Sequence, residues 1–264
     1  MADSKAVEIG GRAGFVARGV IYVLVGVLAV RVAFSDSGGR QADRGGALAE
    51  IAGKPFGHVL LWLLGIALAG MALWRLSEAA FGQAGPDGRK PAKRAAAAAR
   101  CVFYAFVSYS VLAYAVGEKG SGSGSTDKRT EDVTAKALNW PGGQWIVGAA
   151  GVAVACIGLW IAIRAAMRKF HKHLKMAEMS PRERRAVDFL GVFGGVARGV
   201  VFAAAGVFAV VAAVQHDPGK SKGMDNTLRS FTDTSAGPWL LVLVAVGLVA
   251  FGVFSWANAR WRKV

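Results

Sequence analysis

The sequence predicts an all-α, polytopic membrane protein with six transmembrane helices in three tandem hairpin repeats. Composition is the first reason: 54% of the 264 residues are hydrophobic and 35 are glycine. With a mean hydropathy of +0.39, this is too apolar for an ordinary soluble domain of this length. The second reason is the placement of charge. The net charge is +15, but the basic residues occupy short loops between long apolar runs, which indicates a membrane rather than nucleic acid as the partner.

Six apolar runs predict the helices, at residues 15–34, 56–76, 95–116, 145–163, 189–214 and 239–257. Their lengths are near the roughly 20 residues that cross about 30 Å of hydrocarbon. Backbone N–H and C=O groups need partners within the same segment once water is excluded, so we expect helices. The shorter alternating strands of a membrane barrel do not occur in this sequence. An even number of spans puts both termini on one side.

The basic residues predict which side that is. About two thirds of the 32 Lys and Arg residues lie in the N-terminus, the second and fourth loops and the C-terminus, where such residues mark the cytoplasmic side. We therefore expect a bacterial cell membrane protein with both termini cytoplasmic. The strongest signal is the basic stretch from Arg164 to Arg185. It either sets the topology alone or also binds anionic lipid headgroups, which we expect as partners on the cytoplasmic side.

One signature opens the first, third and fifth spans, with an arginine at its centre. The three copies read Ala17-Arg18-Gly19-Val20, Ala99-Arg100-Cys101-Val102 and Ala197-Arg198-Gly199-Val200. An aromatic residue follows each arginine by four, and small residues stand four before and eight after it. Steps of four keep these residues on one helix face. The residues are Tyr22, Tyr104 and Phe202, then Gly14, Ala96 and Gly194, then Gly26, Ser108 and Gly206.

The even spans repeat as well. Lys54-Pro55-Phe56-Gly57 resembles Trp140-Pro141-Gly142-Gly143, and a weaker Gly237-Pro238-Trp239 opens the sixth span. The pair Gly65 and Gly70 aligns with Gly151 and Cys156, and then with Gly247 and Gly252. Glycines at such spacing let helices approach closely in lipid, so we interpret them as packing sites rather than a ligand cradle. This set comprises Gly14, Gly26, Gly65, Gly70, Gly151, Gly206, Gly247 and Gly252.

The repeats divide the chain into a cytoplasmic N-terminus (1–12), three hairpin repeats (13–82, 95–168 and 187–264) and a basic cytoplasmic loop (169–186). Each repeat holds two spans, so all three copies face the same way and a pseudo-threefold bundle about the membrane normal is expected. The outer loops carry short apolar-spaced pieces that predict interfacial helices. These pieces contain Leu48 and Ile51, then Val133, Ala137 and Leu138, then Leu228 and Phe231.

These openings resemble those of a bacterial membrane protein family built from three copies of a two-helix domain, catalogued as domain of unknown function 1206. The similarity rests on the Ala-Arg-Gly-Val openings at Arg18 and Arg198, the Ala-Arg-Cys-Val variant at Arg100, and the Pro-x-Gly start of the even spans. It covers roughly Gly11 to Trp261. The second copy differs, with Cys101 and Ser108 where the others have Gly. The resemblance implies six spans in a bacterial cytoplasmic membrane and implies no activity.

The repeated arginines allow two interpretations. Each lies within snorkelling reach of the headgroups, so it can be an inherited cytoplasmic anchor. Alternatively, Arg18, Arg100 and Arg198 form a ring that binds the phosphate of a lipid headgroup or an anionic solute, with Tyr22 and Tyr104 stacked on the guanidinium groups. If the arginine faces point inward they make a site, and if outward they make lipid anchors.

The sequence offers no catalytic centre. It contains no Ser/His/Asp set, HExxH, Walker loop or metal-ligand spacing, so we expect no enzyme, metal or cofactor. No acid or histidine lies mid-span, which disfavours coupled transport. The third span is the most polar, but Ser108 and Tyr109 more often bond neighbouring helices than line a path. We expect a non-catalytic structural, sensing or assembly protein, and whether it has a protein partner stays open. The alternative is a passive channel or transporter for a small or anionic solute. A membrane enzyme ranks third.

Overall fold

The computed structural model describes residues 2–34, 42–82, 90–117, 126–222, 226–228 and 237–262. Within these ranges the regular secondary structure is helical, apart from one isolated β-bridge between Leu174 and Arg262. Six helices are long and apolar enough to cross a membrane. They are α1 (Ala2–Phe34), α3 (Gly57–Phe81), α4 (Pro91–Ala115), α6 (Gly143–Ala166), α7 (Pro181–Gln215) and α9 (Gly237–Trp261). The prediction of an all-α, six-span membrane protein is confirmed.

Short helices occupy the connections between the first and second helix of a repeat. They are α2 (Arg44–Ala52), α5 (Thr126–Leu138) and the 3-10 turn η3 (Pro218–Lys220). In α2, Leu48 and Ile51 are buried against the bundle, whereas Val133 of α5 is exposed. Of these two helices, α5 therefore presents an apolar residue outward, as an interfacial helix would, although its Ala137 and Leu138 are half-buried. Leu228 is buried, and Phe231 lies outside the described residues.

The helix α7 is longer than its apolar run. Ser180 caps it by accepting from the Glu183 amide, and the Glu183 side chain accepts from the Ser180 amide in return. This capping box, followed by Pro181 at the first helical position, starts the helix two turns before the apolar run begins at Phe189. The basic residues Arg182, Arg184 and Arg185 therefore extend a spanning helix instead of belonging to the preceding loop.

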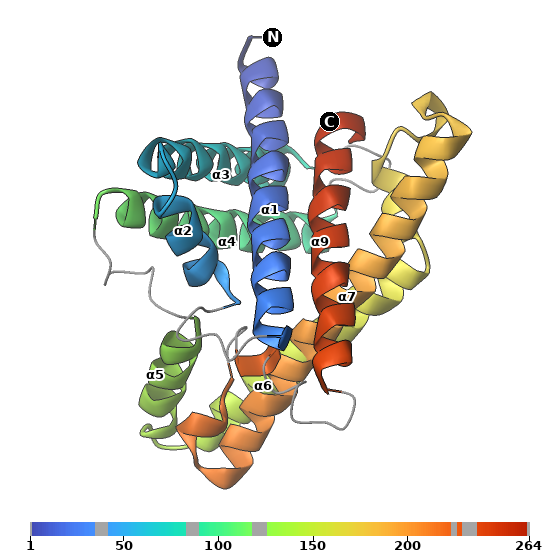
Figure 1. Ribbon diagram of the computed structural model, residues 1–264. Coiled ribbons are helices and arrows are strands. Elements are labelled where there is room, and N and C mark those ends of the chain that lie inside the picture. Colours follow the sequence, from blue (N-terminus) through green and yellow to red (C-terminus); the bar gives the residue numbers. More distant parts are fainter. Residues whose placement is uncertain are drawn as a thin grey trace.

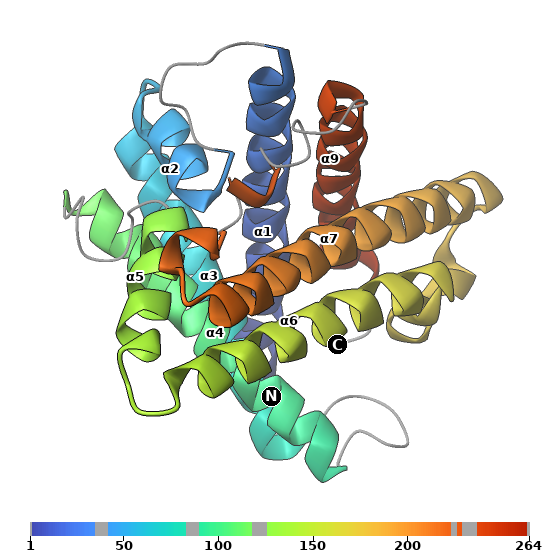
Figure 2. The same cartoon turned by 90° about the horizontal axis from the view of Figure 1, so that it is seen from below.

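Three antiparallel helix pairs make up the assembly: α3 with α4, α6 with α7, and α9 with α1. Each pair joins the second helix of one repeat to the first helix of the next, and the last repeat closes back on the first. Figures 1 and 2 show that the pairs cross one another steeply instead of running parallel. The covalent hairpin is thus not the main packing unit, although the cyclic order agrees with the three tandem copies.

Small residues bring the helices of two pairs, α6 with α7 and α9 with α1, into backbone contact. A Cβ on Gly158 would lie 2.3 Å from the Ala203 nitrogen and 2.7 Å from the Gly199 oxygen. One on Gly252 would lie 2.8 Å from the oxygen of Gly19. Contacts this short exclude any side chain, so van der Waals packing of bare backbone holds these two pairs together.

All eight glycines predicted as packing sites lie against a neighbouring helix, but the alignment of the sixth span was wrong by two residues. Gly65 and Gly151 face the first helix of the next repeat, opposite Ser108 and Gly206. In α9 the residue that makes this contact, with Gly26, is Ala245. Gly247 instead packs on Ala197, and Gly70 on Gly10, both inside their own repeat. Alanine at position 245 is small enough for the pair contact, so glycine identity alone misled the alignment.

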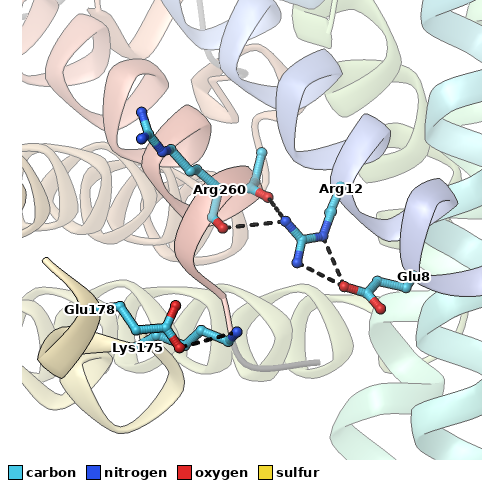
Figure 3. Close-up of polar contacts among 6 residues, drawn as sticks. Glu8, Arg12, Lys175, Glu178 and Arg260 are labelled. Atoms are coloured by element: carbon cyan, nitrogen blue, oxygen red, sulfur yellow. Dashed lines mark hydrogen bonds and ion pairs between the residues drawn. The ribbon is translucent and has the colours of Figure 1, made fainter. Parts of the chain in front are cut away.

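Both ends of the described chain meet on one side, which we call the terminal side. Arg12 of α1 donates through Nη1 to the carbonyl oxygens of Ala259 and Arg260, at 3.2 and 3.3 Å, and pairs with Glu8 at 2.7 Å (Figure 3). The loop after α6, with 3-10 turns η1 (Lys169–His173) and η2 (Met176–Glu178), crosses the same side. The start of α1 is thereby tied to the end of α9.

Candidate anion site

Arg18, the first repeated arginine, lies inside the assembly. Its Nε donates to Ser255 Oγ of α9 at 3.0 Å, and its Nη1 donates to the Tyr104 hydroxyl of α4 at 3.3 Å. Its guanidinium carbon stands 4.7 Å from the ring centroid of Phe15 and 5.2 Å from that of Phe251. Because these contacts come from three helices, Arg18 points inward and does not extend to the lipid surface as an anchor.

Arg198, the third repeated arginine, approaches the same aromatic ring from α7. Its guanidinium carbon lies 4.8 Å from the Phe251 centroid, 5.3 Å from that of Phe202 and 5.6 Å from that of Tyr22. Its Nε is buried and has no hydrogen-bond partner within the described residues. Phe251 is therefore shared by Arg18 and Arg198, two cations that repel each other.

Two further arginines continue this arrangement. Arg262, just beyond α9, lies 5.0 Å from the Phe15 centroid and 4.9 Å from that of Trp74. Arg75 of α3 lies 4.3 Å from the Trp74 centroid on the same terminal side. Arg75 is only 4% exposed. Its Nη1 donates to Glu78 Oε2 at 2.5 Å, while its Nε is buried without a partner in the described chain.

Guanidinium groups and aromatic rings thus alternate through the assembly, in the order Arg75, Trp74, Arg262, Phe15, Arg18, Phe251 and Arg198. We call its four arginines the arginine cluster. Of the described carboxylates, Glu78 is the one that pairs with a member of the cluster. Ring faces stabilise each cation by about 0.5–2 kcal/mol but carry no countercharge. Four positive charges against one negative charge, partly out of water, make a site suited to an anion with several oxygens.

The second repeat departs from this arrangement. Arg100 of α4 is exposed at the edge of the cluster, within electrostatic range of Arg75 and Glu78. In the other repeats the arginine contacts the aromatic residue of the next repeat: Arg18 bonds Tyr104, and the Arg198 guanidinium lies over Tyr22. No corresponding contact between Arg100 and α7 is found in the described chain. The predicted ring of three arginines is therefore a partial ring of two, supplemented by Arg75 and Arg262.

The loop after α6 covers the terminal side of the cluster. Leu174 is fully buried and bridges to Arg262, and the Lys175 amide donates to the Trp261 oxygen at 2.9 Å. His171 pairs with Asp188 of α7. Burial lowers the pKa of His173 to about 4, and the nearby charge of Arg262 adds to this effect. The loop therefore places a neutral histidine, not a further cation, over the cluster at neutral pH.

Burial also affects Arg262, the cluster member just beyond α9. It lowers the pKa of Arg262 to about 9, with the charge of Arg75 as the second cause. The charge of Arg75 thus makes it harder for Arg262 to stay protonated. A bound anion would relieve this repulsion, because opposite charge favours the protonated form.

Other chemistry finds little support in the described residues. No group of three or more His, Cys, Asp or Glu side chains that would hold a metal ion occurs there. The polar third span uses Ser108 to donate to the Gly65 oxygen at 2.8 Å, which joins α4 to α3. Tyr109 is exposed on the outer surface. Neither residue lines a path through the bundle.

The model of the family described as Domain of Unknown Function (DUF1206) matches three times, at residues 13–82, 95–168 and 193–262. The chain belongs to this family. The DUF1206 chain is also similar to the uncharacterized protein YxxB of Bacillus subtilis (strain 168), with 28% identity over 260 residues, 96% of this chain and 92% of that protein. No solved structure matches it. It is thus a multi-pass membrane protein of a bacterial family, and its relatives bring no activity with them.

Sequence reasoning on this DUF1206 chain found the repeated arginines and missed their two companions. Arg75 has no counterpart in the other repeats, since the equivalent residue is Ile161 in α6 and Ser255 in α9, and Arg262 lies outside the repeated arginine signature. One signal was available. Arg75 and Glu78, opposite charges three residues apart near the end of an apolar helix, suit a buried pair.

Proposed function

We propose that this protein is a non-catalytic component of the bacterial cytoplasmic membrane that binds an anionic lipid headgroup on its cytoplasmic side, in a sensing or assembly role. The observation that supports this best is the alternation of four arginines with aromatic rings, including two buried guanidinium nitrogens without a partner in the described chain. Arginine's planar fork suits phosphate oxygens, and the rings orient it without neutralising it.

The orientation is part of the proposal. The basic bias of the loops on the terminal side supports placing that side in the cytoplasm. There the arginine cluster would lie near the headgroups of the inner leaflet, whose anionic lipids attract basic segments. A phosphate that enters the cluster would meet several guanidinium groups at once, in a setting with less water than the surface.

Native mass spectrometry tests the proposal. Protein in phosphatidylcholine nanodiscs is titrated with phosphatidylglycerol, and wild type is compared with the Arg18→Gln, Arg198→Gln double variant. Hydrogen bonds to charged groups contribute about 1.5–3 kcal/mol each, so we expect at least about tenfold weaker binding per arginine lost. The control, Arg182→Gln with Arg185→Gln, removes the same charge from exposed positions on α7. Equal binding by all three proteins would refute the proposal.

The inward arginines also keep an anion channel as the second candidate. Chloride or phosphate efflux from liposomes separates the two functions. If the wild type conducts anions and the Arg18→Gln, Arg198→Gln variant does not, anion conduction replaces lipid binding as the function. If the liposomes show no anion efflux and the protein still retains phosphatidylglycerol, the result supports the binding function.

A further inference from the structure

The second repeat is open where the other two are closed. In the first and third repeats the two helices pack on each other, α1 on α3 and α7 on α9, whereas α4 and α6 make no extensive contact within the described residues. Three equivalent side chains on the second helix show the difference. Met71 and Phe251 are 0% and 6% exposed, but Ile157 is 54% exposed. The series Trp74, Trp160 and Phe254 behaves the same way, at 5%, 57% and 7%.

The sequence of α4 explains this opening. In the closed repeats two glycines one turn apart make the contact. A Cβ on Gly14 would lie 2.2 Å from the Met71 Cβ, and one on Gly194 would lie 2.4 Å from the Phe251 nitrogen. The equivalent residue of α4 is Ala96, whose Cβ is the group for which those contacts leave no room.

The second glycine of the pair shows the same substitution. A Cβ on Gly11 would lie 2.9 Å from the ring of Trp74, and one on Gly191 would lie 2.9 Å from the ring of Phe254. The equivalent residue of α4 is Lys93, which is exposed. A lysine and an alanine at the two closest approaches prevent α4 from packing on α6 in the way that α1 packs on α3.

The opening has the polarity of a lipid. At its terminal end lie cations: Arg100 on α4, Arg164 near the end of α6 and Lys169 just after it, the last two 5.8 and 6.0 Å from the Trp160 centroid. Further from the terminal side, α6 presents the apolar Ile157 and Trp160. Arg100 is also the repeated arginine that lies at the edge of the cluster, within electrostatic range of Arg75. A charged end beside an apolar wall fits a headgroup with its acyl chains below.

We propose that the opening between α4 and α6 is the lateral entrance through which an anionic phospholipid reaches the arginine cluster, with its phosphate at Arg100 and the cluster and its acyl chains against α6. The inference rests on the proposed function and adds the route and the occupant. A phospholipid diffuses in the plane of the membrane, so it needs a sideways path between helices to bring its headgroup inside. Within the described assembly, the second repeat is the one in which the glycines that close the hairpin are replaced, by Lys93 and Ala96, so it is the repeat that supplies such a path.

Native Cys156 provides the test, because it lies on the α6 face of the opening and is exposed. Its equivalents Gly70 and Ala250 pack on the first helix of their repeats. The chain has 2 cysteines, so Cys101→Ala leaves Cys156 as its single thiol. This variant is labelled with a bulky biotin maleimide, and the exchange of fluorescent phosphatidylglycerol between vesicles and the nanodisc-embedded protein is followed. We expect the label to slow exchange by about tenfold or more.

The control carries the same label elsewhere. In a Cys101→Ala, Cys156→Ala background, Leu243→Cys puts the thiol on the exposed face of α9, and its label should leave exchange unchanged. As an independent arm, Lys93→Gly with Ala96→Gly should let α4 approach α6 and also slow exchange.

The outcomes separate the two proposals. If unlabelled protein binds no phosphatidylglycerol in preference to phosphatidylcholine, the proposed function fails. If it binds the lipid selectively but labelled Cys156 exchanges it as fast as the Leu243→Cys control, only the entrance is wrong. A Cys156 thiol that a lipid-soluble maleimide does not reach in the bilayer would also overturn the entrance.

Discussion

Replacing Gly158 by alanine tests whether bare backbone contact holds the helix pairs together. The new Cβ would lie 2.3 Å from the Ala203 nitrogen and 2.7 Å from the Gly199 oxygen. Ordinary contact begins near 3.4 Å, so α6 and α7 must separate by about 1 Å, and overpacking of this kind costs about 1–3 kcal/mol. This separation weakens the contact between α6 and α7, which is the most extensive of the three helix pairs. We expect a net loss of about 1–2 kcal/mol after the better helix propensity of alanine is subtracted.

The same helix offers a matched control. A Cβ on Gly148 would meet only the Ala213 Cβ, at 3.7 Å, so Gly148→Ala should be neutral or stabilising by up to about 1 kcal/mol. Unfolding of both variants in mixed micelles, followed by circular dichroism as sodium dodecyl sulfate is added, gives the comparison. If Gly158→Ala proves as stable as Gly148→Ala, the close backbone contacts do not determine the stability of the pair.

Two further predictions concern charge. Glu78→Gln leaves Arg75 buried without its carboxylate and should cost about 3–5 kcal/mol, whereas Glu178→Gln removes an exposed pair with Lys175 and should cost about 0–1 kcal/mol; equal thermal shifts would contradict the buried pair. His173, with its pKa lowered to about 4, stays neutral in the folded state while the unfolded chain binds a proton below its ordinary pKa of 6.5. Unfolding free energy should therefore fall by about 1–2 kcal/mol between pH 6.5 and 4, because partial exposure screens the full effect. His173→Gln should remove that part of the pH dependence in chemical denaturation, and an unchanged profile would refute it.

The spans and their tandem order were predictable because both follow from local pattern. A run of apolar residues reports its length directly, and the arginine signature recurs at Arg18, Arg100 and Arg198. Which helices pair was not predictable in the same way. Glycines serve both kinds of contact, since Gly65 faces the next repeat and Gly70 packs inside its own, so glycine identity does not say which helices pair. Only side-chain size at Lys93 and Ala96 separates the closed repeats from the open one.

The candidate site was predictable only in its repeated half. Arg18 and Arg198 share a pattern, and the structure places both beside Phe251. Phe251 itself gave no signal, since it is one apolar residue in an apolar helix. Arg262 lies outside the repeated arginine pattern, because it follows the last span. Its bridge to Leu174, in the loop after α6, helps to hold it over the bundle.

The pairing of α9 with α1 has a consequence for biogenesis. The ribosome delivers α1 first and α9 last, so the N-terminal span must wait in the bilayer for almost the whole of synthesis before its principal neighbour arrives. Until then its bare Gly19 and Gly26 face lipid or an insertion factor. Completion of the chain, and not the emergence of each hairpin, is thus the moment at which the architecture locks.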